Sequence, residues 1–286
     1  MSEMFGTSVP FYKMQGCGND FVVIDNRELG VAKAVMPQWA EKICARAFGV
    51  YADGLFFIDH APEDSSLDYI WHFYNSDGSR AEMCGNASRC AGRLAYALDI
   101  APAEHTFGTD AGPIKARVIT EGPQRGQVKV QLTPPKGTET NIALNMDGTD
   151  MTVHFADTGV PHAVVFVDDV EKTDVQKLGA AIRYHERFAP AGTNVNFAQV
   201  KDRETMLLRT YERGVENETY ACGTGAAATQ LLASTLGLTD ATAALTTTGG
   251  EVLTISLEGG NVFLQGAAEM TFSGELYLDA LGLKLR

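Results

Sequence analysis

The sequence predicts a mixed α+β fold made of two similar halves, each with strands wrapped around a helix. Most apolar segments are short, alternate with polar residues and are bounded by Gly, Pro or Asp, which is typical of strands. Few segments have helical periodicity, and one order of segments occurs twice. A chain of 286 residues also exceeds the usual size of a single core, so two domains are expected.

Strands and helices follow from these patterns. Apolar–polar alternation predicts strands over residues 127–133, 151–157, 162–168, 194–200, 205–211, 251–266 and 274–280, with a hairpin turn at 258–260. Helical periodicity predicts helices over residues 37–48, 86–98, 171–185 and 226–238. In the second helix Ala87, Cys90 and Leu94 share one face, so Cys90 is expected in the core.

The repeated order runs through both halves. "GCGNDFVVID" (16–25) and "DTGVPHAVVFVD" (157–168) are each a polar turn followed by an apolar strand. "FYNSDGSRAEMCGNASRCAGRL" (73–94) and "TYERGVENETYACGTGAAATQLL" (210–232) each run as strand, polar turn, Cys-Gly and helix. We interpret this repeat as an old duplication. It predicts one domain over 1–133, carrying Cys84, and a second over 134–274, carrying Cys222, with a final strand over 275–286 that returns to the first. The junction is expected in 131–141, which is rich in Pro, Gly and Thr.

Charge and composition exclude several classes of protein. The formal net charge of −13 argues against nucleic acid as a partner and against an anionic membrane surface, because both attract basic proteins. No apolar run is long enough to span a bilayer, and the N-terminus does not have the pattern of a signal peptide. We therefore expect a cytoplasmic protein.

The five cysteines are Cys17, Cys44, Cys84, Cys90 and Cys222. An odd number without a Cys-x-x-Cys pair predicts neither a disulfide framework nor a zinc site. A buried apolar role is the ordinary expectation for a cysteine. Cys84 and Cys222 differ because each precedes glycine where a helix is expected to begin. A helix N-terminus stabilises a thiolate, and its free N–H groups can hold a carboxylate.

Two such thiols suit inversion of an α-carbon. One acid–base group removes the proton from one face and the other delivers a proton to the opposite face. On this hypothesis the two halves share an amino-acid substrate.

Four segments carry a family resemblance. "MQGCGNDF" (14–21), "NSDGSRAEMCGNASRC" (75–90), "GTNVNFAQ" (192–199) and "YERGVENETYACGTGA" (211–226) resemble the signature blocks of the diaminopimelate epimerase family. The resemblance implies two pseudo-symmetric domains, each a barrel-like sheet around a central helix. It implies interconversion of LL- and meso-diaminopimelate for lysine and peptidoglycan synthesis, without pyridoxal phosphate or metal, in a homodimer.

The resemblance also assigns roles by position. Cys84 and Cys222 would be the catalytic pair, and His162 would lie near the site. The substrate-binding residues would be Asn19, Asn75, Gly85, Asn86, Asn194, Glu212, Arg213, Gly223 and Thr224. Of these, Gly85-Asn86 and Gly223-Thr224 would hold the α-carboxylate through backbone N–H groups, and the planar fork of Arg213 would suit the distal carboxylate.

The sequence departs from the family pattern at two positions. Val160 stands where the family often has asparagine, and Gly54 where it sometimes has glutamine. Both departures bear on the exact substrate. A histidine- or proline-type racemase that uses the same two thiols therefore remains an alternative. A thiol-redox or ligand-binding protein on the same scaffold is the alternative from another class.

Overall fold

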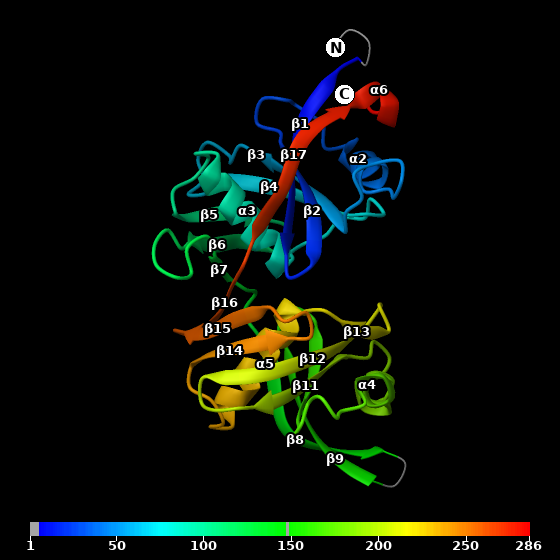
Figure 1. Cartoon of the computed structure of the whole chain (residues 1–286), viewed down its shortest axis with the longest axis vertical. Helices are drawn as coiled ribbons and strands as arrows, with labels where there is room; N and C mark the ends of the chain where they lie inside the picture. The colour runs from blue at the N-terminus through cyan, green and yellow to red at the C-terminus, as the bar shows by residue number, and fades with distance from the viewer. Residues whose placement is uncertain (1–5, 147–148) are drawn as a thin grey trace. The chain divides into compact units, whose positions relative to one another are not determined.

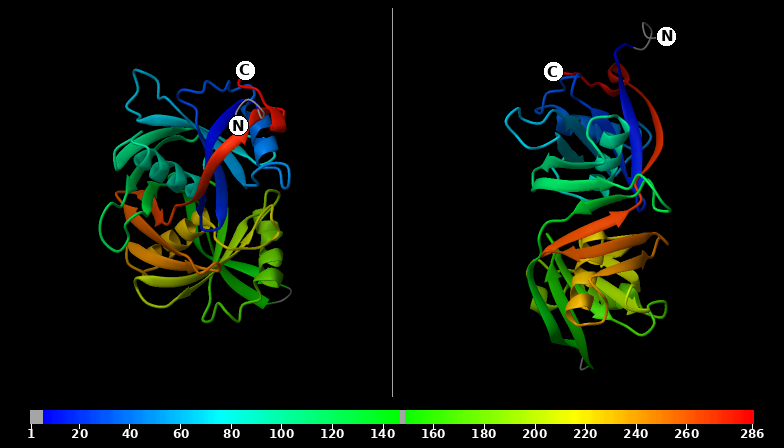
Figure 2. Two further views of the ribbon diagram at one scale, coloured as in Figure 1. Left: turned by 45° about the horizontal axis from the view of Figure 1, so that its top comes forward. Right: turned by 90° about the vertical axis from the view of Figure 1, so that its left-hand side faces the viewer.

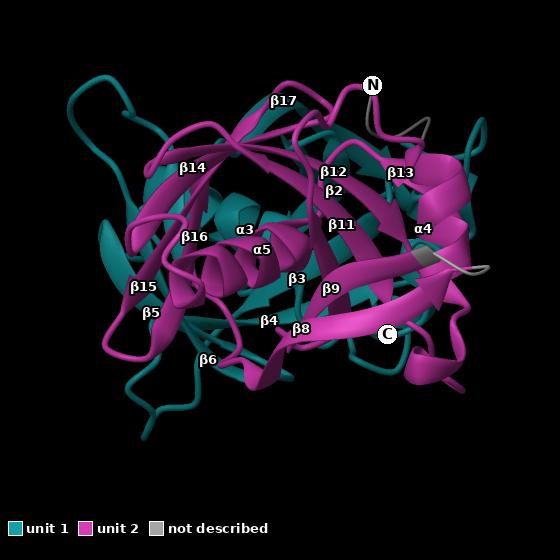
Figure 3. Ribbon diagram, turned by 90° about the horizontal axis from the view of Figure 1, so that it is seen from below, with its two compact units in different colours: residues 1–130, 267–286 teal, residues 131–266 magenta. Residues whose placement is uncertain are grey.

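The computed structural model describes residues 6–146 and 149–286, and its elements confirm the mixed α+β fold class (Figure 1). The chain divides into two compact units. Unit 1 comprises residues 1–130 and 267–286, and unit 2 comprises residues 131–266 (Figure 3). Within the described residues, no helix combines the length and the apolar character that crossing a membrane requires.

Unit 1 is built on one run of paired strands. Its order is β17 (Glu269–Tyr277), β1 (Ser8–Gly16), β2 (Asn19–Asp25), β3 (Gly54–Asp59), β4 (Tyr69–Asn75), β5 (Glu104–Thr109), β6 (Gly112–Val118) and β7 (Val128–Gln131). Its helices are α2 (Met36–Ile43), α3 (Gly85–Ala97) and the short α6 (Leu278–Leu281). Figure 2 shows β1 and β17 side by side, as their antiparallel register requires.

Unit 2 repeats this plan. Its strand order is β8 (Lys136–Met146), β9 (Thr149–Asp157), β10 (Pro161–Phe166), β11 (Asn194–Val200), β12 (Thr205–Glu212), β14 (Thr242–Thr247), β15 (Val252–Glu258) and β16 (Asn261–Gly266). The short β13 (Asn217–Thr219) pairs with the end of β12. The helices are α4 (Val175–Arg183), α5 (Gly223–Thr235) and the 3-10 turn η1 (Glu186–Phe188).

The sense of pairing establishes the repeat. From β1 to β7 it runs antiparallel, parallel, antiparallel, parallel, antiparallel, antiparallel, and the run from β9 to β16 is the same. In both units the second parallel pair is joined through a helix, α3 or α5, because parallel neighbours need a crossover connection. The two halves therefore place matching residues at matching positions.

Small side chains let the strands enclose these two helices. Ala87, Ala91 and Ala95 of α3 are fully buried, as are Ala226, Ala227 and Ala228 of α5. In Figure 3, α5 lies within the ring of unit 2 strands. The α5 helix is apolar around most of its circumference and has no face that favours water, so enclosure is its stable environment. Cys90 is fully buried on α3, as its position on the apolar face predicts.

Several predicted bounds differ from the structure. The helix expected over 37–48 ends at Ile43, and Ala47 beyond it has a φ of 69°, which a helix cannot contain. The helix expected over 171–185 begins at Val175, because the Asp174 side chain caps it by accepting from the Lys177 N–H. Strands β1, β3, β5, β6, β8, β13 and β14 were not predicted.

The expected domain bounds of 1–133, 134–274 and 275–286 also differ from the observed units. The return to unit 1 begins at residue 267. The reason is the length of β17, which pairs with β1 from Glu269 to Tyr277. The strand expected over 274–280 therefore covers only the end of β17 and most of α6.

Candidate active site

Cys84 and Cys222 have the same local setting. Each is the N-cap of a 13-residue helix, with extended dihedral angles of φ −145°, ψ 125° for Cys84 and φ −126°, ψ 108° for Cys222. Neither helix has an acidic residue in its first turn. Both thiols therefore stand at a helix end where N–H groups lack helical partners and negative charge is favoured. The Cys84 side chain is half-buried and Cys222 is 8% exposed.

The Cys84 thiol faces an amide oxygen. Cys84 Sγ lies 3.6 Å from Asn19 Oδ1, to which the thiol donates, and Asn86 Nδ2 donates to the same oxygen at 3.3 Å. Asn19 Nδ2 donates to Asp53 Oδ2 at 2.6 Å. Because an ionised carboxylate only accepts hydrogen bonds, Asp53 fixes the Asn19 amide with its nitrogen turned away from Cys84. Asn19 and Asn86, both predicted site residues, thus lie beside Cys84.

The Cys222 thiol faces a hydroxyl group. Cys222 Sγ lies 3.5 Å from Thr224 Oγ1, and Thr224 Oγ1 lies 3.0 Å from His162 Nε2. The Thr224 carbonyl also accepts from the Thr158 hydroxyl at 3.0 Å, which ties the first turn of α5 to the loop before β10. His162 and Thr224, both predicted from the sequence, therefore lie beside Cys222. Thr210 and Tyr220 line the same small depression as the thiol.

His162 is fully buried and held from behind. Asn196 Nδ2 lies 3.1 Å from His162 Nδ1 and donates to the Ala163 carbonyl at 3.0 Å. Thr210 Oγ1 donates to Asn196 Oδ1 at 3.0 Å. Burial, with a smaller contribution from the nearby charge of Arg213, lowers the pKa of His162 to about 3. The imidazole is therefore neutral at physiological pH.

Arg213 and Asn194 are joined at the end of β12. The Arg213 backbone N–H donates to Asn194 Oδ1 at 2.8 Å, and Asn194 Nδ2 donates to the Pro161 carbonyl at 3.2 Å. The Arg213 guanidinium is half-buried and reaches the Ala191 carbonyl at 3.3 Å. Burial raises the pKa of Glu212, the preceding residue. A guanidinium, an amide and a carboxyl group therefore gather at the start of the β12–β13 turn.

Asn75 behaves as a turn residue. Its side chain is exposed and donates to Ser79 Oγ at 2.9 Å, and its backbone N–H donates to the Ser79 carbonyl. Gly54 pairs with Asn75 across β3 and β4. A Cβ at Gly54 would lie 2.8 Å from the Tyr74 carbonyl oxygen and 2.9 Å from the Phe73 ring. Glycine at this position is therefore explained by the close approach of β4.

The register also shows what the two departures correspond to. Leu55 pairs with Tyr74 in unit 1, and Val195 pairs with Tyr211 in unit 2, so Gly54 and Asn194 are equivalent. By the same alignment of β2 with β10, Val160 is equivalent to Asn19. Each unit thus carries one asparagine of a pair: unit 1 has Asn19 and lacks a side chain at Gly54, whereas unit 2 has Asn194 and an apolar side chain at Val160.

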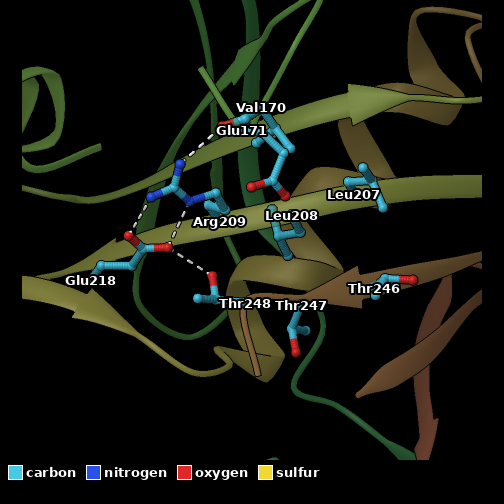
Figure 4. A pocket seen from close by; sticks show the side chains of 9 residues that line it. All are labelled: Val170, Glu171, Leu207, Leu208, Arg209, Glu218, Thr246, Thr247 and Thr248. Atoms are coloured by element: carbon cyan, nitrogen blue, oxygen red, sulfur yellow. Dashed lines mark hydrogen bonds and ion pairs between the residues drawn. The ribbon is translucent and has the colours of Figure 1, made fainter. Parts of the chain in front are cut away.

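A further pocket of about 300 Å³ lies elsewhere in unit 2 (Figure 4). Arg209 and Glu218 form a double hydrogen bond in it at 2.8 and 2.6 Å, and Thr248 donates to Glu218 at 2.8 Å. Arg209 also donates to the Val170 and Thr173 carbonyls. None of the predicted site residues lines this pocket. Its ion pair binds the β12–β13 hairpin together.

Metal-binding side chains do not cluster in the described parts of the chain: no group of three or more His, Cys, Asp or Glu residues there is arranged to hold a metal ion. Sequence reasoning missed Asp53, Asn196 and Thr210. Alternation along a strand offers the signal for Asn196, because Asn194 and Asn196 are two residues apart and point to the same face of β11. No comparable signal marks Asp53, which contacts Asn19 through the fold alone.

Comparison with known proteins adds independent findings. A family model described as diaminopimelate epimerase matches residues 11–137 and 154–271. A diaminopimelate epimerase from Aquifex aeolicus is 48% identical over 283 residues, covering 95% of this chain and 99% of the relative. One from Hydrogenobaculum is 45% identical over 273 residues, covering 92% of this chain and 97% of the relative.

Solved structures show the same fold at low identity. A Bacillus anthracis phenazine biosynthesis protein of the PhzF family superposes with a TM-score of 0.72 at 13% identity, covering 95% of this chain and 99% of the other. A hydroxyproline epimerase from Agrobacterium vitis superposes with a TM-score of 0.68 at 15% identity, covering 95% and 93%. The sequence matches extend through both units and include both cysteine-containing segments. The chain belongs to the diaminopimelate epimerase family.

Proposed function

We propose that the protein is an isomerase that interconverts LL- and meso-diaminopimelate by proton transfer at one α-carbon. Family membership supports the substrate, and the observation that carries the chemistry is the placement of Cys84 and Cys222 as N-caps of equivalent helices. This reaction supplies precursors for lysine and peptidoglycan.

In the proposed reaction one thiolate removes the α-proton, which breaks the Cα–H bond and forms an S–H bond. The thiol of the other cysteine delivers its proton to the opposite face of the same carbon, so the substrate is inverted and the thiolate passes from one cysteine to the other. Backbone N–H groups of Gly85-Asn86 and Gly223-Thr224 hold the α-carboxylate and stabilise negative charge that develops next to it.

The far end of the substrate carries an amino and a carboxylate group. We assign Arg213 to the distal carboxylate, because a guanidinium can donate two parallel hydrogen bonds to it. Asn194 supports this assignment, since it orients the Arg213 backbone at 2.8 Å. Asn19 and Glu212 supply further polar contacts. Asn75 contributes through the turn in which its side chain contacts Ser79.

A homodimer in the cytoplasm is the proposed setting. The exposed apolar side chains of Met270 and Phe272 on β17, 54% and 49% accessible, offer a surface for a second copy. The five cysteines form no disulfide bond in the described part of the chain, which suits a reducing compartment. Sedimentation at micromolar concentration tests the dimer, and a mass of 30.8 kDa would refute it.

The decisive experiment follows deuterium into the substrate. Purified protein is incubated with LL-diaminopimelate in deuterium oxide, with a chelator and without pyridoxal phosphate, and the α-deuterium and the meso product are measured. Cys84→Ser and Cys222→Ser are expected to abolish product formation. Exchange into proline or histidine but not diaminopimelate would establish the alternative racemase activity. Absence of any exchange would favour the redox or binding protein.

A further inference from the structure

The two thiols differ in what lies behind them. When β2 is aligned with β10, β3 with β11 and β4 with β12, three buried phenylalanines of unit 1 are equivalent to three polar residues of unit 2. Phe21, Phe56 and Phe73 contact one another, with ring centroids 5.8 to 6.3 Å apart. Their equivalents are His162, Asn196 and Thr210, which form the hydrogen-bonded network behind Cys222.

The orientation of Asn196 is determined by its neighbours. One end of its amide lies 3.0 Å from the Ala163 carbonyl, which only accepts, so this end is the NH₂ group. The other end accepts from the Thr210 hydroxyl at 3.0 Å. Asn196 is fully buried. The amide therefore donates to His162 Nδ1.

This contact fixes the tautomer of His162. Because Nδ1 receives a hydrogen bond, its lone pair is free of a proton, and a neutral imidazole then carries its proton on Nε2. The Nε2–H group donates to Thr224 Oγ1 at 3.0 Å. The Thr224 oxygen accepts from His162, and the hydroxyl proton, which points away from the Nε2–H group, is available to Cys222 Sγ at 3.5 Å.

Unit 1 has the opposite polarity. Asp53 turns the oxygen of Asn19 toward Cys84, so the side chain beside this thiol accepts a hydrogen bond. A thiol is stabilised by an acceptor and a thiolate by a donor. Each cysteine stands at the N-terminus of its own helix. The two differ in the side chain that contacts the thiol, which is Asn19 for Cys84 and Thr224 for Cys222.

We propose that Asn196 is a positioning residue which, through the tautomer of His162, directs the Thr224 hydroxyl proton to Cys222 and makes Cys222 the thiolate of the resting pair, with the proton on Cys84. This proposal rests on the proposed function and deepens it. It assigns which thiol begins as base when the substrate arrives.

Other titratable or charged groups belong to the elements that carry the two networks. On the side of Cys222 these are the neutral His162 on β10, with Glu212 and Arg213 at the end of β12. On the side of Cys84 they are Asp53, which also contacts Asp20, and Arg89 and Cys90 on α3; Asp20 in turn pairs with Lys13 at 2.6 Å. These groups are the same in the wild type and in variants of Asn196, so a comparison of variants isolates the network.

The first test is the tautomer itself. Nitrogen-15 NMR of the full chain labelled in histidine, without substrate, is expected to show a protonated Nε2 and an unprotonated Nδ1 for His162, identified by its loss in His162→Gln. A protonated Nδ1 would overturn the proposal.

The second test measures both thiols in one molecule. The rate of iodoacetamide alkylation at Cys222 and Cys84 is measured as a function of pH by peptide mass spectrometry. The midpoint of each rate–pH curve reports the pKa of that thiol, because the accessibility of the thiol changes the height of the curve and not its midpoint. The Cys222 midpoint is expected below the Cys84 midpoint. In Asn196→Leu and in Thr224→Val the Cys222 midpoint is expected to rise by about one pH unit, roughly a ten-fold loss of rate at lower pH, with Cys84 unchanged.

Thr229→Val is the matched control. Thr229 is fully buried on the same helix, and its hydroxyl has no hydrogen-bond partner among the described residues. A Cys222 midpoint at or above that of Cys84 in the wild type, or an Asn196→Leu variant that matches Thr229→Val, overturns the proposal. If Asn196→Leu does not fold, the tautomer and Thr224→Val decide. Neither test uses turnover, so failure to epimerise diaminopimelate would refute the proposed function separately.

Discussion

Gly225 makes room for Asn196: a Cβ at Gly225 would lie 2.3 Å from Asn196 Oδ1. The equivalent residue of α3 is Ala87, whose side chain is fully buried. The polar network of unit 2 therefore depends on a missing side chain in the first turn of α5.

Replacing this glycine is expected to displace Asn196. Gly225→Ala should lower kcat/KM about ten-fold or more and destabilise the protein by about 1–3 kcal/mol, as overpacking of a core does. Gly92→Ala in α3 is the control, because its new Cβ would meet Ala116 and Val128 at 3.3 Å, which a shift of a few tenths of an ångström relieves. Steady-state kinetics and urea unfolding measure both effects. Equal kcat/KM values and equal free energies of unfolding for the two variants would show that Asn196 moves aside without loss of activity or stability.

Arg213→Lys is expected to reduce kcat/KM roughly ten- to a hundred-fold, because lysine cannot form two parallel hydrogen bonds to the distal carboxylate. Arg203→Lys is the control: Arg203 is exposed and pairs with Asp240 at 2.6 Å. Near wild-type kinetics for Arg213→Lys would mean that Arg213 does not bind the substrate.

His162 is expected to make stability depend on pH. Its pKa is lowered to about 3 by burial, from an ordinary 6.5. Below pH 6.5 the unfolded chain binds a proton that the folded chain does not, so stability falls with pH until about pH 3. From pH 7 to pH 5 this one group accounts for a loss of about 2 kcal/mol.

Urea unfolding at pH 7, 6 and 5 checks this slope. His162→Gln should lose less stability over this range than the wild type, whereas His60→Gln, at an exposed position, should follow the wild type. Burial also lowers the pKa values of His72, His105 and His154, so a residual slope is expected. An unchanged slope in His162→Gln would contradict the assignment.

The two departures from the family pattern are Gly54 and Val160. Introducing the family residue at each position is expected to have different effects. Gly54→Gln is expected to destabilise unit 1, because its Cβ would meet the Tyr74 carbonyl at 2.8 Å. Val160→Asn lies in the half-buried turn before β10 and should be tolerated, with KM for diaminopimelate lowered by an added polar contact. Thermal melting and KM separate the cases. A stable, active Gly54→Gln protein would show that β4 can move far enough to accommodate a side chain at this position.

The sequence predicted those features that depend on local pattern. The Cys-Gly turns, the helices that follow them and the repeat were readable because periodicity and glycine placement act over a few residues. The beginning of α4 was missed because Asp174 was placed inside the expected helix, although its side chain caps that helix. The full length of β17 was missed because its pairing with β1 joins residues at opposite ends of the chain.

The site shows the same division. Asn19, Asn86, His162 and Thr224 were found through their motifs and lie beside the thiols, whereas their catalytic and binding roles remain predictions. Asp53 and Thr210 act only through the side chains that they hold. Such residues carry no motif, because any donor or acceptor at the right place in space would serve.

The enclosure of α5 by strands has a consequence for hydrogen exchange. Amide protons in the middle of this helix are shielded on every side, so they exchange only when the unit as a whole unfolds. The α5 helix, which carries Cys222 at its N-terminus, is then the last part of unit 2 to unfold in denaturant. The exposed turn around Val215, which lies between β12 and β13, should exchange far sooner. Activity lost at low denaturant would therefore report the release of Arg213 rather than of the thiol.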